Sequence, residues 1–539
     1  MHETSVNHDL FDSLASMDHD TFWKVWRNQT KEGDSLVTRV EGETTEIGIA
    51  DVFCNHFQKV YSGSDSPRHL SLRDEFLLKF NVYQNEHIHD SISPYFASWS
   101  DMVNVVGKIK SGKASSGPIR PEHLFHGSPK LLFHLHLLFN AMIQHGIVVD
   151  DFVKGTITPI VKDSQGDVSS CSNYRGITLC GLFSKLFEMI LDEKLAPFLE
   201  SDCLQFGFKK KTSTSHAIYT LKTAVDYFNK RGSDVFVAFL DCSKAFDRIS
   251  HYGLFIKLME RQIPLCLLYL IIFWHLNMSC KVKWGDAFSK EFPVPLGTKQ
   301  GGISSPKFFS LYIDGLIDVL RRSGLGCHLI HKFVGAILFA DDLALFAPSR
   351  SALQKMITIC RKFCETLCLD FNSSKSKVLI FGKSCNDTVV PLTLKSCALD
   401  FVCEWKYLGV TIVSGKTLSF SARSDLSSFF RASNAITSTL RGAHEHTLLT
   451  LIYSNCVPII SYACAVKQYS AREMSECNTA INNALRKVFG FTEWQSIRTL
   501  REAFGFPSIY ETFKKAETSF LNSCRYHSNP VIRFLISVD

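Results

Sequence analysis

Two short apolar segments that each lead into aspartate constrain this chain more than any other feature. The run 235–240 is almost continuously apolar and ends at Asp241. The apolar run 334–340 leads 100 residues later into Asp341 and Asp342, after which the apolar pattern resumes. Short apolar runs bounded by polar residues predict buried strands, and the second run predicts a strand, a tight turn and another strand.

The acidic ends of these strands predict a shared cation site. Carboxylates beside apolar strands are costly unless something neutralises their charge. A hard divalent ion such as Mg²⁺ prefers a few carboxylates together with phosphate oxygens, and two such ions can hold both oxygens of a phosphoryl displacement. From these residues alone the alternative stays open that each acid simply caps a strand or turn at the surface.

Composition limits the classes to which the chain can belong. Of its 539 residues, 45% are hydrophobic and 21% are charged, which excludes a mainly disordered chain. The longest apolar stretch, 263–274, is interrupted by Pro264 and is shorter than the roughly 20 residues that span a bilayer. The 18 cysteines show no metal-binding spacing and the start shows no signal peptide, so we expect an intracellular, nuclear or cytoplasmic protein that is not secreted.

A series of further motifs surrounds the two acidic segments in a fixed order. They are Thr158 to Lys162, Asn173 to Leu179, Phe239 to Asp247, Leu296 to Pro306, Phe339 to Asp342, Phe371 to Lys377 and Trp405 to Val410. In order and spacing, over roughly residues 105–415, these segments resemble the reverse transcriptases of LINE-type (non-LTR) retrotransposons.

The resemblance implies an α+β fold, the right-hand polymerase with fingers, palm and thumb. It implies an antiparallel palm sheet within fingers and palm at 105–414, a helical N-terminal extension at 1–104, and a helical thumb and C-terminal region at 415–539. The implied activity is an RNA-directed DNA polymerase that adds dNTPs to a primer 3′-OH. Its implied partners are an RNA template, a DNA primer and the RNA–DNA hybrid, with no membrane; the oligomeric state is not readable.

The resemblance also implies the metal ligands. Asp241 and Asp341 are expected to bind two Mg²⁺ ions, for which Mn²⁺ could substitute. Asp342 is expected to be a weaker ligand, since neighbouring side chains in extended chain point to opposite faces. The backbone carbonyl of Cys242 is expected to complete one coordination sphere. Lys375 is the candidate to protonate or hold pyrophosphate, although Lys377 is equally near in sequence.

Five residues are expected to hold the incoming nucleotide. Lys162 and Arg175 resemble the cations of the fingers that bind the triphosphate, with a guanidinium fork for phosphate oxygens in the second. Phe246 is expected to stack beneath the sugar and to exclude a 2′-OH. Gln300 and Gly301 are expected to line the nucleotide pocket, the glycine because backbone must approach closely there.

Two further expectations concern residues 407–409 and Asp247. Tyr407, Leu408 and Gly409 are expected to form the primer grip, with a plain β-turn as the alternative. Asp247 is expected to cap the segment that follows it.

Some features depart from the pattern. The turn 116–121 is two residues shorter than is usual in this family, and Gly302 adds backbone freedom where the loop should be firm. Only about 100 residues precede the polymerase motifs, so we expect a truncated copy that lacks the endonuclease domain. The alternative function is a decayed or co-opted protein that binds RNA or a hybrid with little or no polymerase activity.

Overall fold

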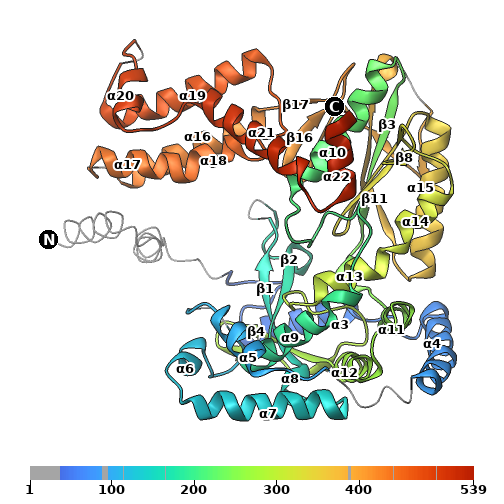
Figure 1. Cartoon of the computed structure of the whole chain (residues 1–539). Coiled ribbons are helices and arrows are strands. Elements are labelled where there is room, and N and C mark those ends of the chain that lie inside the picture. Colours follow the sequence, from blue (N-terminus) through green and yellow to red (C-terminus); the bar gives the residue numbers. More distant parts are fainter. Residues whose placement is uncertain are drawn as a thin grey trace.

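The computed structural model describes residues 37–87, 95–112, 115–163, 166–386, 390–440, 442–492 and 494–538. The first 36 residues of the expected N-terminal extension lie outside these ranges. Figure 1 shows the elements of the chain around a central sheet, with helices below it and a helical arm to one side.

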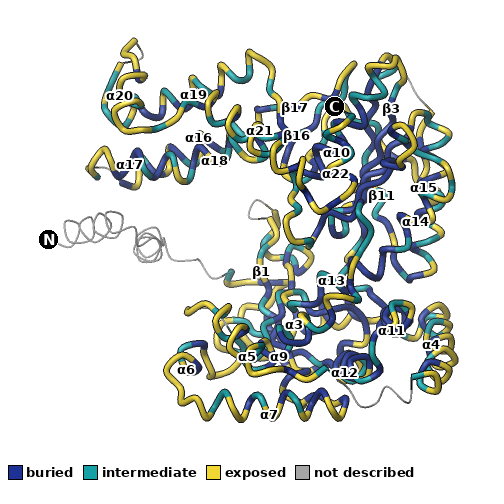
Figure 2. The backbone as a smooth tube through the Cα atoms, in the orientation of Figure 1, coloured by how far each residue is buried: buried dark blue, intermediate teal, exposed yellow. Residues whose placement is uncertain are grey.

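The central sheet confirms the expected antiparallel palm. Its strands, in spatial order, are β14 (Asp400–Phe401), β11 (Phe371–Phe381), β3 (Val235–Cys242), β10 (Asp342–Ala347) and β9 (Ala336–Phe339). All neighbours run antiparallel except β11 and β14. The helices α10 (Thr214–Lys230) and α15 (Arg350–Thr366) pack against this sheet. The strands lie among the buried residues of Figure 2, as their apolar sequences predict.

A second sheet lies below the palm. It contains β2 (Tyr174–Leu179), β1 (Lys154–Val161), β4 (Ser279–Trp284) and β5 (Ala287–Phe288), and β6 (Phe292–Pro293) also pairs with β4. The helix α3 (Glu46–Val60) packs on β4, and α4 (Pro67–Glu86) packs on α11 (His251–Glu260). The described part of the N-terminal extension is therefore helical and lies against the fingers.

Further short helices and strands complete this part of the chain. The helices are α5 (Trp99–Gly107), α6 (Pro121–Phe125), α7 (Pro129–His145), α8 (Asp150–Val153), α9 (Leu182–Leu195), α12 (Leu265–Leu276), α13 (Ser305–Ile313) and α14 (Gly315–Arg322). The short 3₁₀ turns are η2 (Cys171–Asn173), η3 (Ala196–Phe198), η4 (Ala245–Asp247) and η5 (Lys383–Asn386). Two small hairpins are formed by β7 (His328–Leu329) with β8 (Lys332–Phe333) and by β12 (Thr393–Leu394) with β13 (Cys397–Ala398).

The segment 407–413 is part of a hairpin. Strands β15 (Glu404–Tyr407) and β16 (Val410–Val413) are antiparallel, and β17 (Ser419–Phe420) adds a third strand. Leu408 and Gly409 form the turn with φ of 46° and 84°. This left-handed pair reverses the chain, which a pattern of apolar residues alone does not reveal.

The last quarter of the chain is helical, as expected. It comprises α16 (Arg423–Thr439), α17 (Glu445–Leu451), the π-helical turn η6 (Ile452–Cys456), α18 (Val457–Ser461), α19 (Ala471–Phe489), α20 (Arg498–Ala503), α21 (Ile509–Arg525) and α22 (Pro530–Val538). Helices α16 to α20 form the arm at the upper left of Figure 1 and have a core of their own. Helix α22 returns to pack on α10 and joins the core of the palm. In the described part of the chain, no helix has both the length and the apolar character that crossing a membrane requires.

Candidate active site

The palm sheet brings the predicted acids together. In the pairing of β10 with β3, Asp342 lies directly opposite Asp241. Asp341 occupies the two-residue turn between β9 and β10, immediately before this pair. Directly opposed residues of an antiparallel pair have Cα atoms about 4.5–5.5 Å apart, so residues 100 positions apart in sequence share one sheet edge.

The electrostatics of this edge show that the three carboxylates interact. Burial raises the pKa of Asp241, and Lys375 opposes that rise. Burial also raises the pKa of Asp341, with Asp241 adding to the rise and Arg175 opposing it. Asp342 is exposed at the start of its strand, but its carboxylate is partly desolvated. This desolvation, followed by Asp341 and then Asp241, raises the pKa of Asp342 to about 6. Carboxylates that raise one another's pKa are a site where a cation would be favourable.

The donor set fits a divalent cation that takes only part of its ligands from protein. In the described ranges no three His, Cys, Asp or Glu side chains form a ready-made metal cage. Mg²⁺ commonly binds through one or two carboxylates and keeps waters or substrate phosphates as its other ligands. The thiol of Cys242 is buried and burial raises its pKa far above the usual value, so only its backbone carbonyl suits this role.

A pocket of about 170 Å³ joins the acids to the predicted primer grip. It is lined by Phe239, Leu240, Asp241, Asp342, Leu343, Lys375 and residues 405–408. Lys375 therefore lies beside two of the acids, whereas Lys377 forms an ion pair of 2.6 Å with Asp400. Of the two lysines that the sequence could not separate, the structure brings Lys375 to the site.

The turn of the predicted primer grip faces this pocket and is held from the thumb. Tyr407 is buried with its ring 4.7 Å from that of Phe239. Burial, followed by the nearby Asp342, raises its pKa. The carbonyl of Leu408 accepts a hydrogen bond of 3.1 Å from the Tyr462 hydroxyl, and a Cβ on Gly409 would lie 2.8 Å from the Tyr462 ring. The segment is thus a β-turn that also borders the pocket beside the acids.

Of the two cations predicted to bind the triphosphate, one interacts with an acid of the site and the other lies near that cation and Lys375. Lys162 directly follows β1 and donates a hydrogen bond of 2.8 Å to the Ser172 carbonyl. Its pKa is lowered by burial and then by Lys244, Lys375 and Arg175, which shows that these positive groups face one region. Arg175, on β2, interacts with Asp341. Lys244 is a cation of this group that the sequence did not single out.

Phe246 lies in the turn η4, at the end of the segment 239–247 that contains Asp241. Its ring is half-buried and packs on Phe309 at 4.8 Å and edge-to-face on Phe208 at 6.1 Å. Its backbone carbonyl accepts a hydrogen bond of 2.9 Å from the Thr298 amide. The loop that carries Gln300 is thereby attached to the strand end that carries Asp241.

Gln300 and Gly301 are fixed between this motif and β2. The side-chain amide of Gln300 donates a hydrogen bond of 2.7 Å to the Asp247 carboxylate. The backbone carbonyl of Gln300 accepts a hydrogen bond of 2.7 Å from the Thr178 backbone amide. Gly301 has φ of 119°, and a Cβ there would lie 2.8 Å from the Thr178 carbonyl. The expected close approach of backbone at Gly301 is therefore an approach to β2.

Asp247 has a different role from the helix cap that the sequence suggested. It ends the 3₁₀ turn η4, and burial raises its pKa to about 6 while the Gln300 hydrogen bond opposes that rise. The cap of α11 is instead Ser250, whose side chain accepts from the Gly253 amide. The N-cap interpretation of Asp247 is wrong because the turn after β3 is longer than the sequence indicates.

Gly302 lies in a loop that is firmly held. The amides of Ile303 and Ser304 donate to one carboxylate oxygen of Glu188 at 2.7 and 3.1 Å. A Cβ on Gly302 would lie 2.5 Å from Ser305 Oγ and 3.0 Å from Glu188. Glycine at this position is required by packing, and it does not loosen the loop.

Ser376 is a site residue that the sequence did not reveal. It is fully buried where the register of β11 shifts between Asn372 and Lys377. Its hydroxyl accepts from the Asp241 amide at 3.2 Å and donates to the Asn372 carbonyl at 2.7 Å. A serine among lysines gives no sequence signal for this contact, because the contact depends on the bulge.

The comparisons with known proteins agree with this geometry. Residues 160–412 match the family described as "Reverse transcriptase (RNA-dependent DNA polymerase)". The chain is 22% identical over 428 residues to the "Probable RNA-directed DNA polymerase from transposon BS" of Drosophila melanogaster, covering 76% of this chain and 46% of that protein. It is 23% identical over 459 residues to the "RNA-directed DNA polymerase from mobile element jockey" of Drosophila funebris, covering 81% and 48%.

The chain also aligns with a solved structure, and it covers only part of the length of its relatives. A solved telomerase from Candida albicans aligns with 91% of this chain and 96% of its own, at 11% identity and a TM-score of 0.38. The chain spans about a quarter to a half of the length of the curated relatives that it matches. The matched family and the names of the relatives agree with the opposed aspartates, and the chain is similar to the reverse transcriptases of the LINE-type, non-LTR retrotransposon kind.

Proposed function

We propose that this chain is an RNA-directed DNA polymerase that adds dNTPs to a primer 3′-OH on an RNA template. The observation that carries the proposal is the register of the palm sheet, which opposes Asp342 and Asp241 and sets Asp341 in the adjoining turn. These acids lie inside the region that matches the reverse transcriptase family. An RNA template, a DNA primer and their hybrid are accordingly the proposed partners.

The acids are the proposed ligands of two Mg²⁺ ions, with Mn²⁺ as a substitute. Asp241 and Asp341 would hold both ions, Asp342 would hold one more weakly, and the carbonyl of Cys242 would add an oxygen. When bound, such ions make the primer hydroxyl a better nucleophile and stabilise the charge on the leaving group. The raised pKa values of Asp341 and Asp342 support this assignment. After burial, Asp241 raises the pKa of Asp341, and Asp341 and Asp241 raise the pKa of Asp342, so a cation would relieve this repulsion.

The groups of this chain would orient the two reactants. Lys162, Arg175 and Lys375 would bind the triphosphate, which is supported by their grouping on the side of the acids. Lys375 could also give a proton to the departing pyrophosphate, since it lines the pocket with Asp241. Residues 407–409 would support the primer end, since Tyr407 and Leu408 line the same pocket.

Three residues outside the group of cations would select the nucleotide, namely Phe246, Gln300 and Gly301. Phe246 would contact the sugar and exclude a 2′-OH, so that dNTPs are preferred over rNTPs. Gln300 and Gly301 would border the nucleotide, held in place by Asp247 and β2. The chain would act inside the cell, in the nucleus or cytoplasm, where its 18 free cysteines stay reduced.

Primer extension tests the proposal. With poly(rA)·oligo(dT), dTTP and Mg²⁺, the parent chain should extend the primer. The variant Asp341→Asn/Asp342→Asn should lose extension by a factor on the order of 100 or more, because it removes charge from the proposed cation site. Asp400→Asn is the matched control, since it changes an acid of the same sheet that is paired with Lys377.

Hybrid binding separates this function from the alternative. Fluorescence anisotropy with the same hybrid should give similar affinities for the parent and the double variant. Binding without extension by either protein would contradict the polymerase and would support a decayed or co-opted RNA- or hybrid-binding protein.

A further inference from the structure

The turn that carries Asp341 has a backbone that its own sequence does not favour. Ala340, the first residue of this two-residue turn, has φ of 59°. Hairpin turns with positive φ at that place normally contain glycine, because a Cβ there is crowded by the following carbonyl. A strained residue of this kind persists only when its surroundings determine its conformation.

Gln205 supplies such a surrounding. Its side chain is 1% exposed, and its Oε1 accepts a hydrogen bond of 3.2 Å from the amide of Ala340. Its Nε2 donates a longer hydrogen bond of 3.5 Å to the Ala340 carbonyl. One glutamine thus holds both backbone polar groups of the strained residue.

The chain around Gln205 lies tightly against the same turn. Oε1 of Gln205 also accepts from the Gly207 amide at 3.0 Å, which fixes the side chain. A Cβ on Gly207 would lie 2.3 Å from the Ala340 nitrogen, so no other residue fits there. The amide of Phe206 donates to the Leu338 carbonyl at 2.8 Å, and the Leu338 amide donates to Leu204 at 3.0 Å. This segment therefore covers the outer edge of β9.

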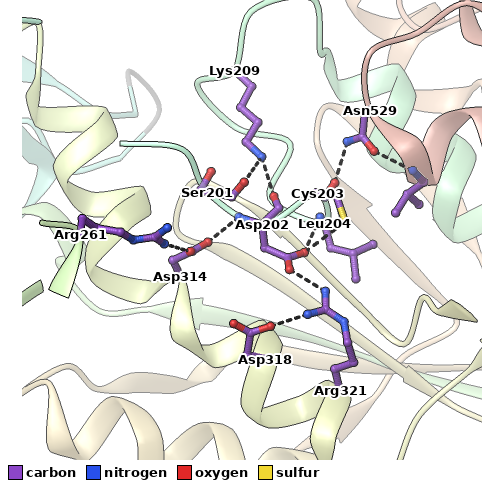
Figure 3. A network of polar contacts seen from close by, with 11 residues as sticks. Ser201, Asp202, Cys203, Leu204, Lys209, Arg261, Asp314, Asp318, Arg321 and Asn529 are labelled. Atoms are coloured by element: carbon purple, nitrogen blue, oxygen red, sulfur yellow. Dashed lines mark hydrogen bonds and ion pairs between the residues drawn. The ribbon is translucent and has the colours of Figure 1, made fainter. Parts of the chain in front are cut away.

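The base of the segment is anchored by a network of charges, shown in Figure 3. Asp202 accepts from the Leu204 amide at 2.8 Å and forms an ion pair of 2.5 Å with Arg321 on α14. The amide of Asp202 donates to Asp314 at 2.6 Å, and Asp314 in turn pairs with Arg261. The segment is thereby fixed to α14 before it reaches the turn.

We propose that Gln205 is a positioning residue that holds the Ala340 backbone and thereby sets the place of Asp341. This inference rests on the proposed polymerase function. The signal in the sequence is Gln205-Phe206-Gly207-Phe208, a buried amide followed by a glycine in an otherwise basic and polar stretch. Gln205 does not touch substrate; it acts through the turn.

A matched control exists elsewhere in the chain. Gln354 on α15 makes the same two-bond contact with the backbone of Thr393, at 2.7 and 2.9 Å. Gln205→Ala removes this pair of hydrogen bonds beside Asp341, together with the bond from the Gly207 amide, and Gln354→Ala removes the same kind of pair away from Asp341. Gln205→Met keeps the side-chain volume more closely and serves if the alanine variant does not fold.

The first measurement is steady-state extension of poly(rA)·oligo(dT) with dTTP. Gln205→Ala and Gln205→Met should lower kcat about 10- to 100-fold with KM for dTTP within about twofold, as expected when a reacting group is displaced but binding is kept. Gln354→Ala should keep the parent's kcat. An active parent with kcat unchanged in the Gln205 variants overturns the inference and leaves the polymerase function standing.

The second measurement does not require polymerase activity. Hydrogen exchange of the peptide covering residues 338–343 should be several-fold faster in the Gln205 variants and unchanged in Gln354→Ala, because the Ala340 amide loses its acceptor. Unchanged exchange in the Gln205 variants overturns the inference even if the parent does not extend a primer. A parent without extension but with the expected exchange contradicts only the proposed function.

Discussion

The carboxylates at the sheet edge give the protein a dependence on pH that can be measured without any substrate. The usual pKa of Asp342 is near 3.8, and in the folded protein burial, Asp341 and Asp241 raise this pKa to about 6. Between these values the folded state holds more protons than the unfolded chain, so the free energy of unfolding should fall as pH rises from about 4 to about 6. Asp247, whose pKa burial raises to about 6, contributes with the same sign.

Asp342→Asn should therefore make this fall smaller. The measurement is urea unfolding at a series of pH values in EDTA, so that no divalent cation neutralises the acids. Asp400→Asn, which changes an exposed acid paired with Lys377, is the control and should follow the parent. Equal pH dependence of the parent and Asp342→Asn would mean that the acids do not interact in the folded protein.

The hairpin of β15 and β16 carries the next prediction, at the scale of an element. Gly409 and Gly442 have nearly equal φ of 84° and 85°, but a Cβ on Gly409 would lie 2.8 Å from the Tyr462 ring, whereas nothing lies within 4 Å of a Cβ on Gly442. Gly442→Ala should lower the free energy of unfolding by about 1 kcal/mol, the cost of the left-handed backbone. Gly409→Ala should cost more and should also raise KM for the primer.

The comparison of the two glycine variants isolates the contact with Tyr462, since both carry the same backbone strain. Chemical unfolding gives the difference in stability, and extension at varied primer concentration gives KM. Similar stabilities and primer KM values for the two variants would show that the thumb does not hold this turn.

The same elements show what the sequence could and could not predict. The strand predicted at 235–240 follows from a local apolar pattern and corresponds to β3, Val235–Cys242. The acidic strand ends and the resemblance predict that Asp241 lies near Asp341 and Asp342, whereas the direct pairing of Asp342 with Asp241 comes from the register of the sheet. The hairpin at 407–413 and the bulge that brings Ser376 to Asp241 depend on backbone reversals and register, which side-chain patterns do not encode.

The whole molecule has an arrangement that chain order conceals. The thumb core contains buried residues between Ala422 and Phe513, whereas Val531, Ile532 and Leu535 of α22 belong to the core of the palm. The segment before α22 is also fixed to the palm, since the Asn529 amide donates to the Cys203 carbonyl at 2.7 Å. The expected single region 415–539 therefore contains two differently packed parts, and its boundaries remain a prediction.

Two matched isoleucines test this arrangement. Ile532 on α22 is 0% exposed and Ile481 on α19 is 3% exposed, so Ile→Ala at either position should cost about 2–5 kcal/mol by leaving a cavity. The two variants should then differ in which elements show faster hydrogen exchange. Ile532→Ala should speed exchange in α10 and β9, which pack together beneath α22, while Ile481→Ala should speed it in α16 and α17, which pack on α19. Faster exchange confined to the thumb in both variants would contradict the placement of α22 in the palm. If α22 packed on the thumb, the cavity left by Ile532→Ala would destabilise the thumb and not the palm sheet.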